Sequence, residues 1–310
     1  MLNVYKTTEQ GFAKLDAIGS GCWLNVVDPT AEEAQKLIER GIETEYINYA
    51  LDQDEMASVE REDEYTFILL RIPIFQGTNV DVPYTTVPLG IFIQENMVTT
   101  ICRYESDIFK VLTNGKYRGL HTAKRYRMAL YIFLETSVRY LNCVRAINKT
   151  TDALEDQLQK STRNREVLEL LKYQKSLTYF ATALRSNGVM MERLQRIQMF
   201  NQYDEDKDLL EDVLTENQQA IQMVNINNEI LSAMMDAFAS IISNNLNSVM
   251  KVLAALTIVT ALPGTVGAFF GMNVPLPISE TSPFSFLAIL GISMGLAALA
   301  TFIFYKRDWF

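Results

Sequence analysis

The chain has 310 residues, which is enough for about two domains of ordinary size. Its 37 acidic residues outnumber its 28 basic residues, and the formal net charge of −9 argues against a nucleic-acid partner and favours attraction of cations. The three cysteines are too widely spaced for a disulfide framework or a Cys-x-x-Cys metal clamp, so we expect them to be core residues in a reducing compartment.

The first 120 residues predict a cytoplasmic domain of the α+β class. Alternation over 22–27 indicates a strand, and Thr30 with Glu33 forms a capping box for a helix that Gly41 can close. Turn-forming residues at 77–79 and 95–96 separate three further predicted strands, at 65–72, 85–93 and 97–102. We therefore expect a mixed sheet with flanking helices.

Beyond about Leu120 the pattern changes to long stretches with apolar residues at helical spacing, and no proline occurs before Pro263. We predict three long helices, at about 122–160, 165–200 and 205–270. The third enters the apolar C-terminal region without a break. The predicted organisation is a cytoplasmic α/β domain over residues 1–120, a cytoplasmic stalk of long helices over 121–250, and a transmembrane domain over 251–310.

Two uncharged runs near the C-terminus are long enough to cross a bilayer. The first covers the 19 residues 252–270 and the second covers the 22 residues 284–305. A helix rises about 1.5 Å per residue, so about 20 residues cross a hydrocarbon core about 30 Å thick. Buried helices of a soluble protein are a poor alternative, because two such runs with a short connector would expose a very large apolar surface.

Basic residues flank the two runs on one side only. Lys251 precedes the first run and Lys306 and Arg307 follow the second, whereas the connector, 271–283, has no Lys or Arg. We therefore expect a multi-pass protein of the cell (inner) membrane with both termini in the cytoplasm. The first residues show no basic segment followed by an apolar run, so no cleavable signal peptide is expected.

One face of the third predicted helix is small or polar along most of its C-terminal half, and we call it the polar stripe. A seven-residue repeat keeps such a face pointing one way in a helix bundle. It suits a hydrated lumen, and it also suits close packing of membrane helices. Two spans can enclose a lumen only in a symmetric ring of subunits. Steps of three and four residues back from Gly271 define the stripe: Ala268, Gly264, Ala261, Thr257, Ala254, Met250, Asn247, Ser243, Ser240, Asp236, Ala233 and Glu229.

The end of the first apolar run carries a recognisable motif. Phe270-Gly271-Met272-Asn273 stands there, and the second run follows after a short connector. Together with Asn247, Pro263 and the basic tail, this motif resembles the Gly-Met-Asn signature of the CorA-type magnesium channel family. The N-terminal half resembles the family more loosely, through Trp23, Pro29-Thr30, Glu33 and the acidic stretch 52–64.

The resemblance implies a homopentamer with a funnel-shaped cytoplasmic domain, a long helix lining the pore, and inward movement of magnesium, often with cobalt or nickel tolerated. The implied partners are further copies of the chain, the lipid membrane and divalent cations, and Mg²⁺ is implied to be both transported and regulatory. The expected pore-lining residues are Asp236, Asn247, Met250, Leu253, Thr257, Ala261 and Gly264.

Gly271, Met272 and Asn273 are the expected selectivity filter. Mg²⁺ gives up its water shell reluctantly and prefers oxygen ligands. A ring of Asn273 side chains and Gly271 carbonyls can therefore hold the hydrated ion through its waters. Asn273 also suits the end of a helix, where Asn is common.

Two departures from the family pattern bear on the pore. Phe270 stands where many members have Tyr, which removes a hydroxyl at the outer mouth. Small residues, Ala261 and Gly264, replace a bulky apolar residue midway along the pore. We therefore expect the hydrophobic constriction at Met250 and Leu253.

Six of the nine residues from Asp204 to Asp212 are acidic, a pattern that is commonly a solvated helix start. Equal spacing to Asn247 and Asn273 nevertheless aligns Asp212 with a carboxylate that the family uses at an intersubunit magnesium sensor. Asp81 is a looser match to the partner of that carboxylate. Glu280 in the connector can attract cations to the outer mouth, although a lone loop carboxylate is more often simply solvated.

An enzyme is not expected, because the sequence has a single histidine, His121, and no phosphate-binding glycine loop or nucleophile motif. The rival functions are a zinc transporter of the same superfamily and a membrane-anchored helical scaffold or receptor without transport. Nitrogen and sulfur ligands, which zinc favours, are nearly absent here.

Overall fold

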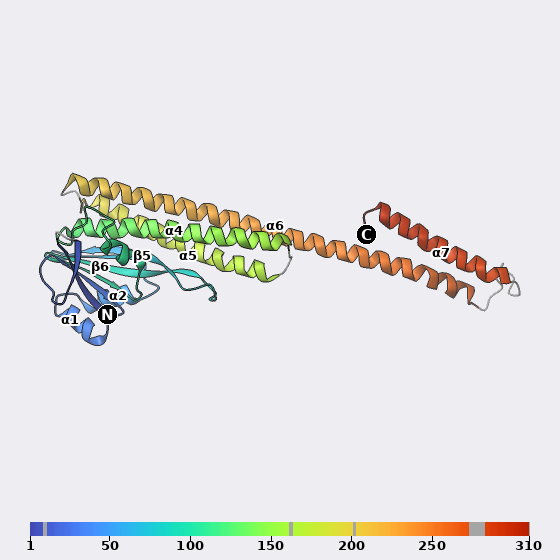
Figure 1. Ribbon diagram of the computed structural model, residues 1–310, viewed down its shortest axis with the longest axis horizontal. Coiled ribbons are helices and arrows are strands. Elements are labelled where there is room, and N and C mark those ends of the chain that lie inside the picture. The colour runs from blue at the N-terminus through green and yellow to red at the C-terminus, as the bar shows by residue number, and fades with distance from the viewer. Residues whose placement is uncertain (9–10, 161–163, 201–202, 273–282, 310) are drawn as a thin grey trace. The chain divides into compact units, whose positions relative to one another are not determined.

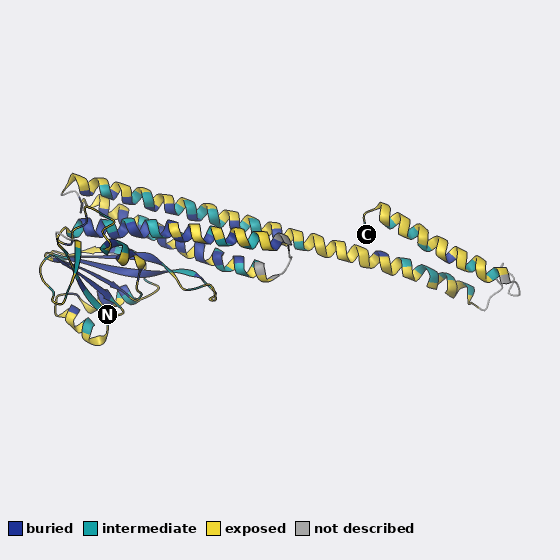
Figure 2. Cartoon of the chain, viewed as in Figure 1, coloured by how far each residue is buried: buried dark blue, intermediate teal, exposed yellow. Residues whose placement is uncertain are grey.

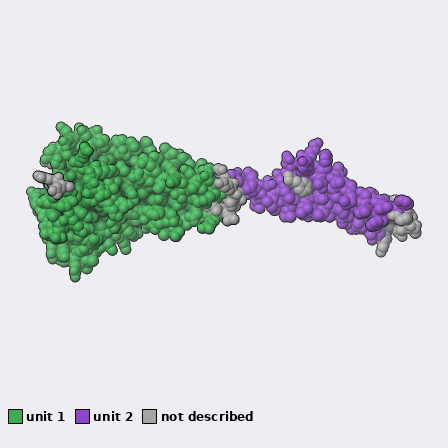
Figure 3. Space-filling view, in the orientation of Figure 1, with its two compact units in different colours: residues 1–235 green, residues 236–310 purple. Residues whose placement is uncertain are grey.

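The computed structural model describes residues 1–8, 11–160, 164–200, 203–272 and 283–309. The chain divides into two compact units, unit 1 over residues 1–235 and unit 2 over residues 236–310 (Figure 3). The division falls inside one continuous helix, α6 (Asp204–Phe270), whose backbone therefore belongs to both units. The functional boundaries near residues 120 and 250 stay predictions.

Unit 1 contains a seven-stranded mixed sheet in the order β2-β1-β3-β7-β6-β5-β4. Strand β3 pairs in parallel with β7, and the other neighbouring strands in this sheet are antiparallel. The mixed sheet and four of its strands were predicted and are confirmed. The strands are β1 (Leu2–Thr8), β2 (Gly11–Leu15), β3 (Cys22–Val27), β4 (Ser58–Arg61), β5 (Tyr65–Phe75), β6 (Tyr84–Gln94) and β7 (Met97–Cys102).

Helices α1 and α2 cover one face of the sheet, and α3 lies with the long helices on the other (Figure 1). Alternate residues of β5 show the two faces, because Phe67 and Leu69 join the core beneath α1 and α2, whereas Ile68 and Leu70 join the core beneath the long helices. The helices of unit 1, besides α6, are α1 (Ala31–Ile38), α2 (Thr44–Leu51), α3 (Asp107–Thr113), α4 (Arg125–Lys160) and α5 (Asn164–Arg196).

The predicted capping box at the start of α1 is present. The Glu33 backbone N–H donates to the Thr30 hydroxyl at 3.3 Å, and the Thr30 N–H donates to the Glu33 carboxylate at 3.0 Å. Two of the N–H groups that a helix start leaves without a helical partner are thereby satisfied. Gly41 follows the helix with φ of 84°, a left-handed conformation that glycine adopts without strain.

The side chain of Asn187 on α5 completes one edge of the sheet. Strand β4 pairs with β5 only over residues 66–69, so β5 has no strand on that side further along. There the Arg71 N–H donates to Asn187 Oδ1 at 2.9 Å, and Asn187 Nδ2 donates to the Arg71 carbonyl at 2.8 Å. Because Asn187 is buried, these two bonds attach α5 to the sheet as a strand would.

The predicted long helices are confirmed as α4, α5 and α6, with boundary shifts of a few residues. In unit 2, α6 is followed by α7 (Pro283–Lys306). Both α6 and α7 contain stretches that are long and apolar enough to cross a membrane. Large apolar side chains are exposed along these stretches, among them Leu256 and Phe286. Much of α7 and of the C-terminal part of α6 is coloured as exposed in Figure 2.

Candidate functional site

The polar stripe is the candidate site, and α6 presents it as one face of a continuous helix. Every residue of the stripe, from Glu229 to Ala268, is exposed in the chain. The less exposed residues of α6 in the apolar stretch lie elsewhere, at Ala255, Val259, Leu262, Pro263, Val266 and Phe270. At about 100° per residue, these positions lie on average roughly 150° around the helix from the stripe. The covered face and the polar stripe are therefore nearly opposite.

Helix α7 lies beside the apolar stretch of α6 within unit 2 (Figure 1). The chain's own second apolar helix leaves the stripe uncovered. An added Cβ at Gly264, on the stripe, would meet no atom within 4 Å. The stripe is thus available to water or to other copies of the chain, as a pore-lining face must be.

The stripe presents oxygen acceptors. The Thr257 hydroxyl donates its one proton to the Leu253 carbonyl at 2.8 Å, so its lone pairs remain free to accept. Asp236 and Asn247 add a carboxylate and a carboxamide on the same face. These groups can accept hydrogen bonds from the waters around a hydrated cation.

The predicted constriction also lies at the surface of α6. Met250 is on the stripe and is 55% exposed, and Leu253 lies next to the stripe and is 54% exposed. Large apolar side chains on an uncovered face can narrow a lumen where several copies of the helix meet. The role of Met250 and Leu253 as a gate remains a prediction.

The predicted filter, Gly271-Met272-Asn273, lies within the described residues only as far as Met272. The Gly271 N–H donates to the Gly267 carbonyl at 2.9 Å, and both Gly271 and Met272 are exposed. A Cβ added to Gly271 would lie 3.3 Å from the Gly267 carbonyl oxygen, so a larger residue would have to displace the last turn slightly. Glycine therefore suits this position, because a residue without a side chain lets the backbone lie close to the Gly267 carbonyl oxygen. Asn273 and Glu280 lie outside the described residues.

The acidic run at the start of α6 contains two kinds of carboxylate. Arg127 on α4 pairs with Asp206, and with Glu205 at 2.6 Å; Arg127 and Asp206 are both buried. Asp208 and Asp212 are exposed four residues apart, where like charges on one helix face repel. The run is thus part structural anchor and part exposed negative face, and only the second part is open to a cation.

Asp81 and Asp212 do not come together within one chain. Lys175 on α5 pairs with Asp81 at 2.8 Å, and the neighbouring Gln174 donates to Ser232 on α6 at 2.8 Å. Asp212 lies twenty residues before Ser232, which is roughly 30 Å along the helix. Lys175 also lowers the pKa of Asp81 through its hydrogen bond, so Asp81 is negatively charged at neutral pH.

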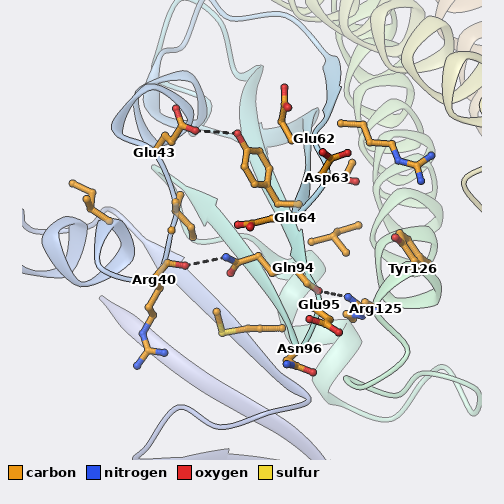
Figure 4. Close-up of a pocket in the computed structure, with 18 residues that line it drawn as sticks. Arg40, Glu43, Glu62, Asp63, Glu64, Gln94, Glu95, Asn96, Arg125 and Tyr126 are labelled. Carbon is orange, nitrogen blue, oxygen red and sulfur yellow. Dashed lines mark hydrogen bonds between the residues drawn. The ribbon is translucent and has the colours of Figure 1, made fainter.

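A polar cleft of about 1080 Å³ lies elsewhere in unit 1, between the ends of the sheet and α4 (Figure 4). Glu43 accepts a hydrogen bond from Tyr65 at 3.1 Å, and the Gln94 side chain donates to the Arg40 carbonyl at 2.9 Å. Over the described parts of the chain, no group of three or more His, Cys, Asp or Glu side chains is arranged to hold a metal ion. The cleft does not contribute to the stripe.

Comparison with known proteins gives a consistent assignment. The model of a family described as CorA-like Mg²⁺ transporter protein matches residues 19–307. The chain is 28% identical over 299 residues to a cobalt/magnesium transport protein CorA of Methanocaldococcus jannaschii, covering 93% of this chain and 90% of that protein. The expected homology to divalent-cation transporters is thereby confirmed.

Solved structures agree with the fold. The complete structure of the CorA magnesium transporter from Methanocaldococcus jannaschii matches with a TM-score of 0.86 and 25% identity, over 100% of this chain and 99% of that one. The cytoplasmic domain of ZntB from Vibrio parahaemolyticus matches with a TM-score of 0.58 and 10% identity, over 79% of this chain and 97% of that one. The second likeness shows the fold alone and gives the zinc alternative little support.

Proposed function

Because the chain belongs to the family of CorA-like Mg²⁺ transporter proteins, we propose that it forms a homopentamer in the cell (inner) membrane and conducts Mg²⁺ into the cytoplasm. Both termini lie in the cytoplasm, since Lys251, Lys306 and Arg307 flank the apolar stretches on one side. Co²⁺ and Ni²⁺ use the same path.

One observation carries this proposal: the polar stripe runs along a continuous helix, and the face covered next to α7 is nearly opposite to it. Five copies of α6 arranged with the stripe inward enclose a lumen lined by Asp236, Asn247, Thr257, Ala261 and Gly264. In that arrangement α7 lies outside, toward lipid. Met250 and Leu253 form the narrow apolar section, which closes by excluding water.

Gly271, Met272 and Asn273 form the filter at the outer end of this lumen, and Glu280 raises the cation concentration there. Asn273→Ala removes the acceptors for the waters of Mg²⁺, so selective uptake should be lost while the ring still assembles. The measurement is Mg²⁺ uptake by liposomes containing the purified protein, with Zn²⁺ uptake as a parallel assay. Undiminished selective Mg²⁺ uptake by the variant contradicts the filter assignment.

The lumen assignment has a matched test on α6. Asn247 is on the stripe, and Asn245 is exposed on the opposite face. Asn247→Ala should lower Mg²⁺ uptake or change ion preference, whereas Asn245→Ala should not. Asp236→Ala and Glu216→Ala form a second pair of the same kind, because Glu216 lies off the stripe. Equal effects of the two members of each pair would show that the stripe does not line the path.

Regulation by internal Mg²⁺ follows from the exposed carboxylates. Asp212 of one subunit shares a Mg²⁺ ion with Asp81 of its neighbour, since the two residues are far apart within one chain. The bound cation relieves repulsion between carboxylates and stabilises a tightly packed, closed ring. A cation shifts the equilibrium only through its different affinity for the two states.

Asp212→Lys places a tethered positive charge where the ion binds and should make flux insensitive to internal Mg²⁺. The measurement is flux against internal Mg²⁺ concentration for the wild-type protein and the variant. Asp206→Asn, which alters the Arg127 anchor of the same helix start, serves as the control for nonspecific disturbance. If the Asp212→Lys curve coincides with the wild-type curve, Asp212 is an ordinary solvated helix residue.

A further inference from the structure

The last turn of α7 folds back on itself in a defined way. The Trp309 N–H donates to the Phe304 carbonyl at 3.0 Å, and the Asp308 N–H donates to the Tyr305 carbonyl at 3.2 Å. Asp308 has φ of 53°, the left-handed conformation that this pair of bonds requires. The geometry is a Schellman motif, which ends a helix by satisfying its last carbonyl groups.

The motif fixes the position of the Trp309 ring. The indole stacks on Phe304 with ring centroids 5.1 Å apart and an interplanar angle of 18°. Trp309 is therefore held against the end of α7 and does not extend away from it. A tryptophan with one apolar face and one polar N–H suits the boundary between lipid and water, where such rings concentrate.

Two cations come directly before Asp308 and Trp309 in the chain. Lys306 and Arg307 are exposed, and neither side chain has a hydrogen-bond or ion-pair partner among the described residues. Lys251 is exposed at the start of the apolar stretch of α6, which α7 accompanies in the opposite direction in unit 2. Among the described residues of this tail, Asp308 is the one acidic side chain, against the two basic side chains of Lys306 and Arg307.

We propose that the last turn of α7 binds the phosphodiester headgroup of an anionic phospholipid, with Lys306 and Arg307 contacting the phosphate and Trp309 lying at the level of the glycerol backbone. The proposal rests on the membrane insertion of α7 argued above. A basic residue near an anionic membrane surface gains free energy from the attraction, and two such residues together correspond to roughly a 30-fold preference for anionic over zwitterionic lipid.

Trp309 is itself the reporter. The chain has two tryptophans, and Trp23 is fully buried in unit 1, so the difference between the wild-type protein and Trp309→Phe isolates the signal of Trp309. The full-length protein is reconstituted with phosphatidylcholine and phosphatidylglycerol brominated near the headgroup. Quenching of Trp309 should be strong, and it should show preferential binding of phosphatidylglycerol. Absence of quenching, or equal binding of the two lipids, overturns the proposal.

Charge removal tests the phosphate contact. The double variant Lys306→Gln with Arg307→Gln should lose the roughly 30-fold preference. The matched control Lys14→Gln with Lys36→Gln removes the same charge from exposed positions of unit 1 and should keep the preference. Excess inorganic phosphate separates a lipid site from a general anion site, because displacement of the lipid preference by free phosphate overturns the assignment to a headgroup.

Mg²⁺ uptake provides a second readout. In phosphatidylcholine liposomes the double variant should take up Mg²⁺ like the wild-type protein, because Lys306 and Arg307 are not part of the proposed conduction path. Loss of lipid preference with normal uptake supports the lipid site. Absence of uptake by the wild-type protein, with lipid preference intact, counts against the proposed conduction alone.

Discussion

Helix α6 meets two different surroundings along its length. In unit 1 its apolar residues Leu210, Val213 and Val224 are buried, as in a soluble protein. In unit 2 most of its large apolar residues are exposed, including Leu253 at 54% and Leu256 at 53%, although Phe238 is buried. The same helix therefore buries apolar residues mainly in unit 1, where Ile226 and Ile230 are exceptions, and mostly exposes them in unit 2.

This difference shows which surroundings each half requires. Exposed apolar patches of this extent are costly in water but stable against lipid or a neighbouring subunit. Against such surroundings the small and polar residues become the unusual ones, which is why the polar stripe carries functional information in unit 2. Matched variants, placed within one unit or in both, test this interpretation.

The largest effect is expected from the buried ion pair of unit 1. Arg127→Ala leaves the buried Asp206 carboxylate without its partner and should lower the free energy of unfolding by about 3 to 5 kcal/mol. Arg196→Ala removes an exposed pair with Glu192 and should have a far smaller effect. The readout is the unfolding of the full-length protein in detergent, followed through buried Trp23. Equal losses for both variants would contradict the buried anchor.

The next largest difference is expected between lysine substitutions of an exposed methionine in each unit. Met294 on α7 is 62% exposed and Met56 in unit 1 is 43% exposed. Met294→Lys should disfavour membrane insertion by about 2.5 to 3.5 kcal/mol and reduce the membrane-integrated fraction. Met56→Lys should change stability by no more than about 0.5 kcal/mol. If both variants integrate as the wild type does, the exposed surface of α7 does not face lipid.

Glycines within α6 distinguish the stripe from the neighbouring faces. A Cβ added at Gly264 or at Gly267 meets no atom within 4 Å in the chain. Leucine at either position should therefore be tolerated by the single chain and improve helix propensity by roughly 0.8 kcal/mol. Gly264→Leu should nevertheless block most Mg²⁺ uptake, because it narrows the lumen, whereas Gly267→Leu should retain uptake. If both variants assemble and take up Mg²⁺ to a similar extent, Gly264 does not line the lumen.

The smallest effect is expected at the cysteines of unit 1. Burial raises the pKa of Cys102 and of Cys143 to about 11, so about one thiol in a thousand is ionised at pH 8. Maleimide labelling of the folded protein should be negligible and should become complete in denaturant. An engineered thiol on the stripe, Ser243→Cys, should react readily in the folded protein when the lumen is hydrated. Rapid labelling of Cys102 in the folded protein would contradict the packing of β7.

Much of the fold could be predicted from the sequence because its periodic elements are long. Strands β5 to β7, helices α4 to α6 and the capping box of α1 each carry local signals that agree with the tertiary structure. The elements β1, β2, β4, α2 and α3 were not predicted. These elements are short, and β1 buries only Val4, so they depend on pairing and packing against distant parts of the chain.

The candidate site could be predicted to a similar extent. The stripe follows from residue spacing on one helix, and the filter and Asp212 follow from the family resemblance. Arg127 and Lys175, which pair with Asp206 and Asp81, could not be found in the same way. Their partners are 79 and 94 residues away in sequence, and nothing in the local pattern joins them.

The hydrogen bonds between Asn187 and Arg71 protect the edge of β5, and their loss has a consequence for aggregation. An edge strand with free N–H and carbonyl groups can pair with the edge of another molecule and start aggregation. Here α5 occupies that edge of β5, so local opening of the stalk uncovers a strand that can recruit a second copy. Lesions in α5 should therefore reduce the amount of soluble protein recovered from cells before they alter any property of the folded protein, and Asn187→Ala should raise the tendency to aggregate during refolding.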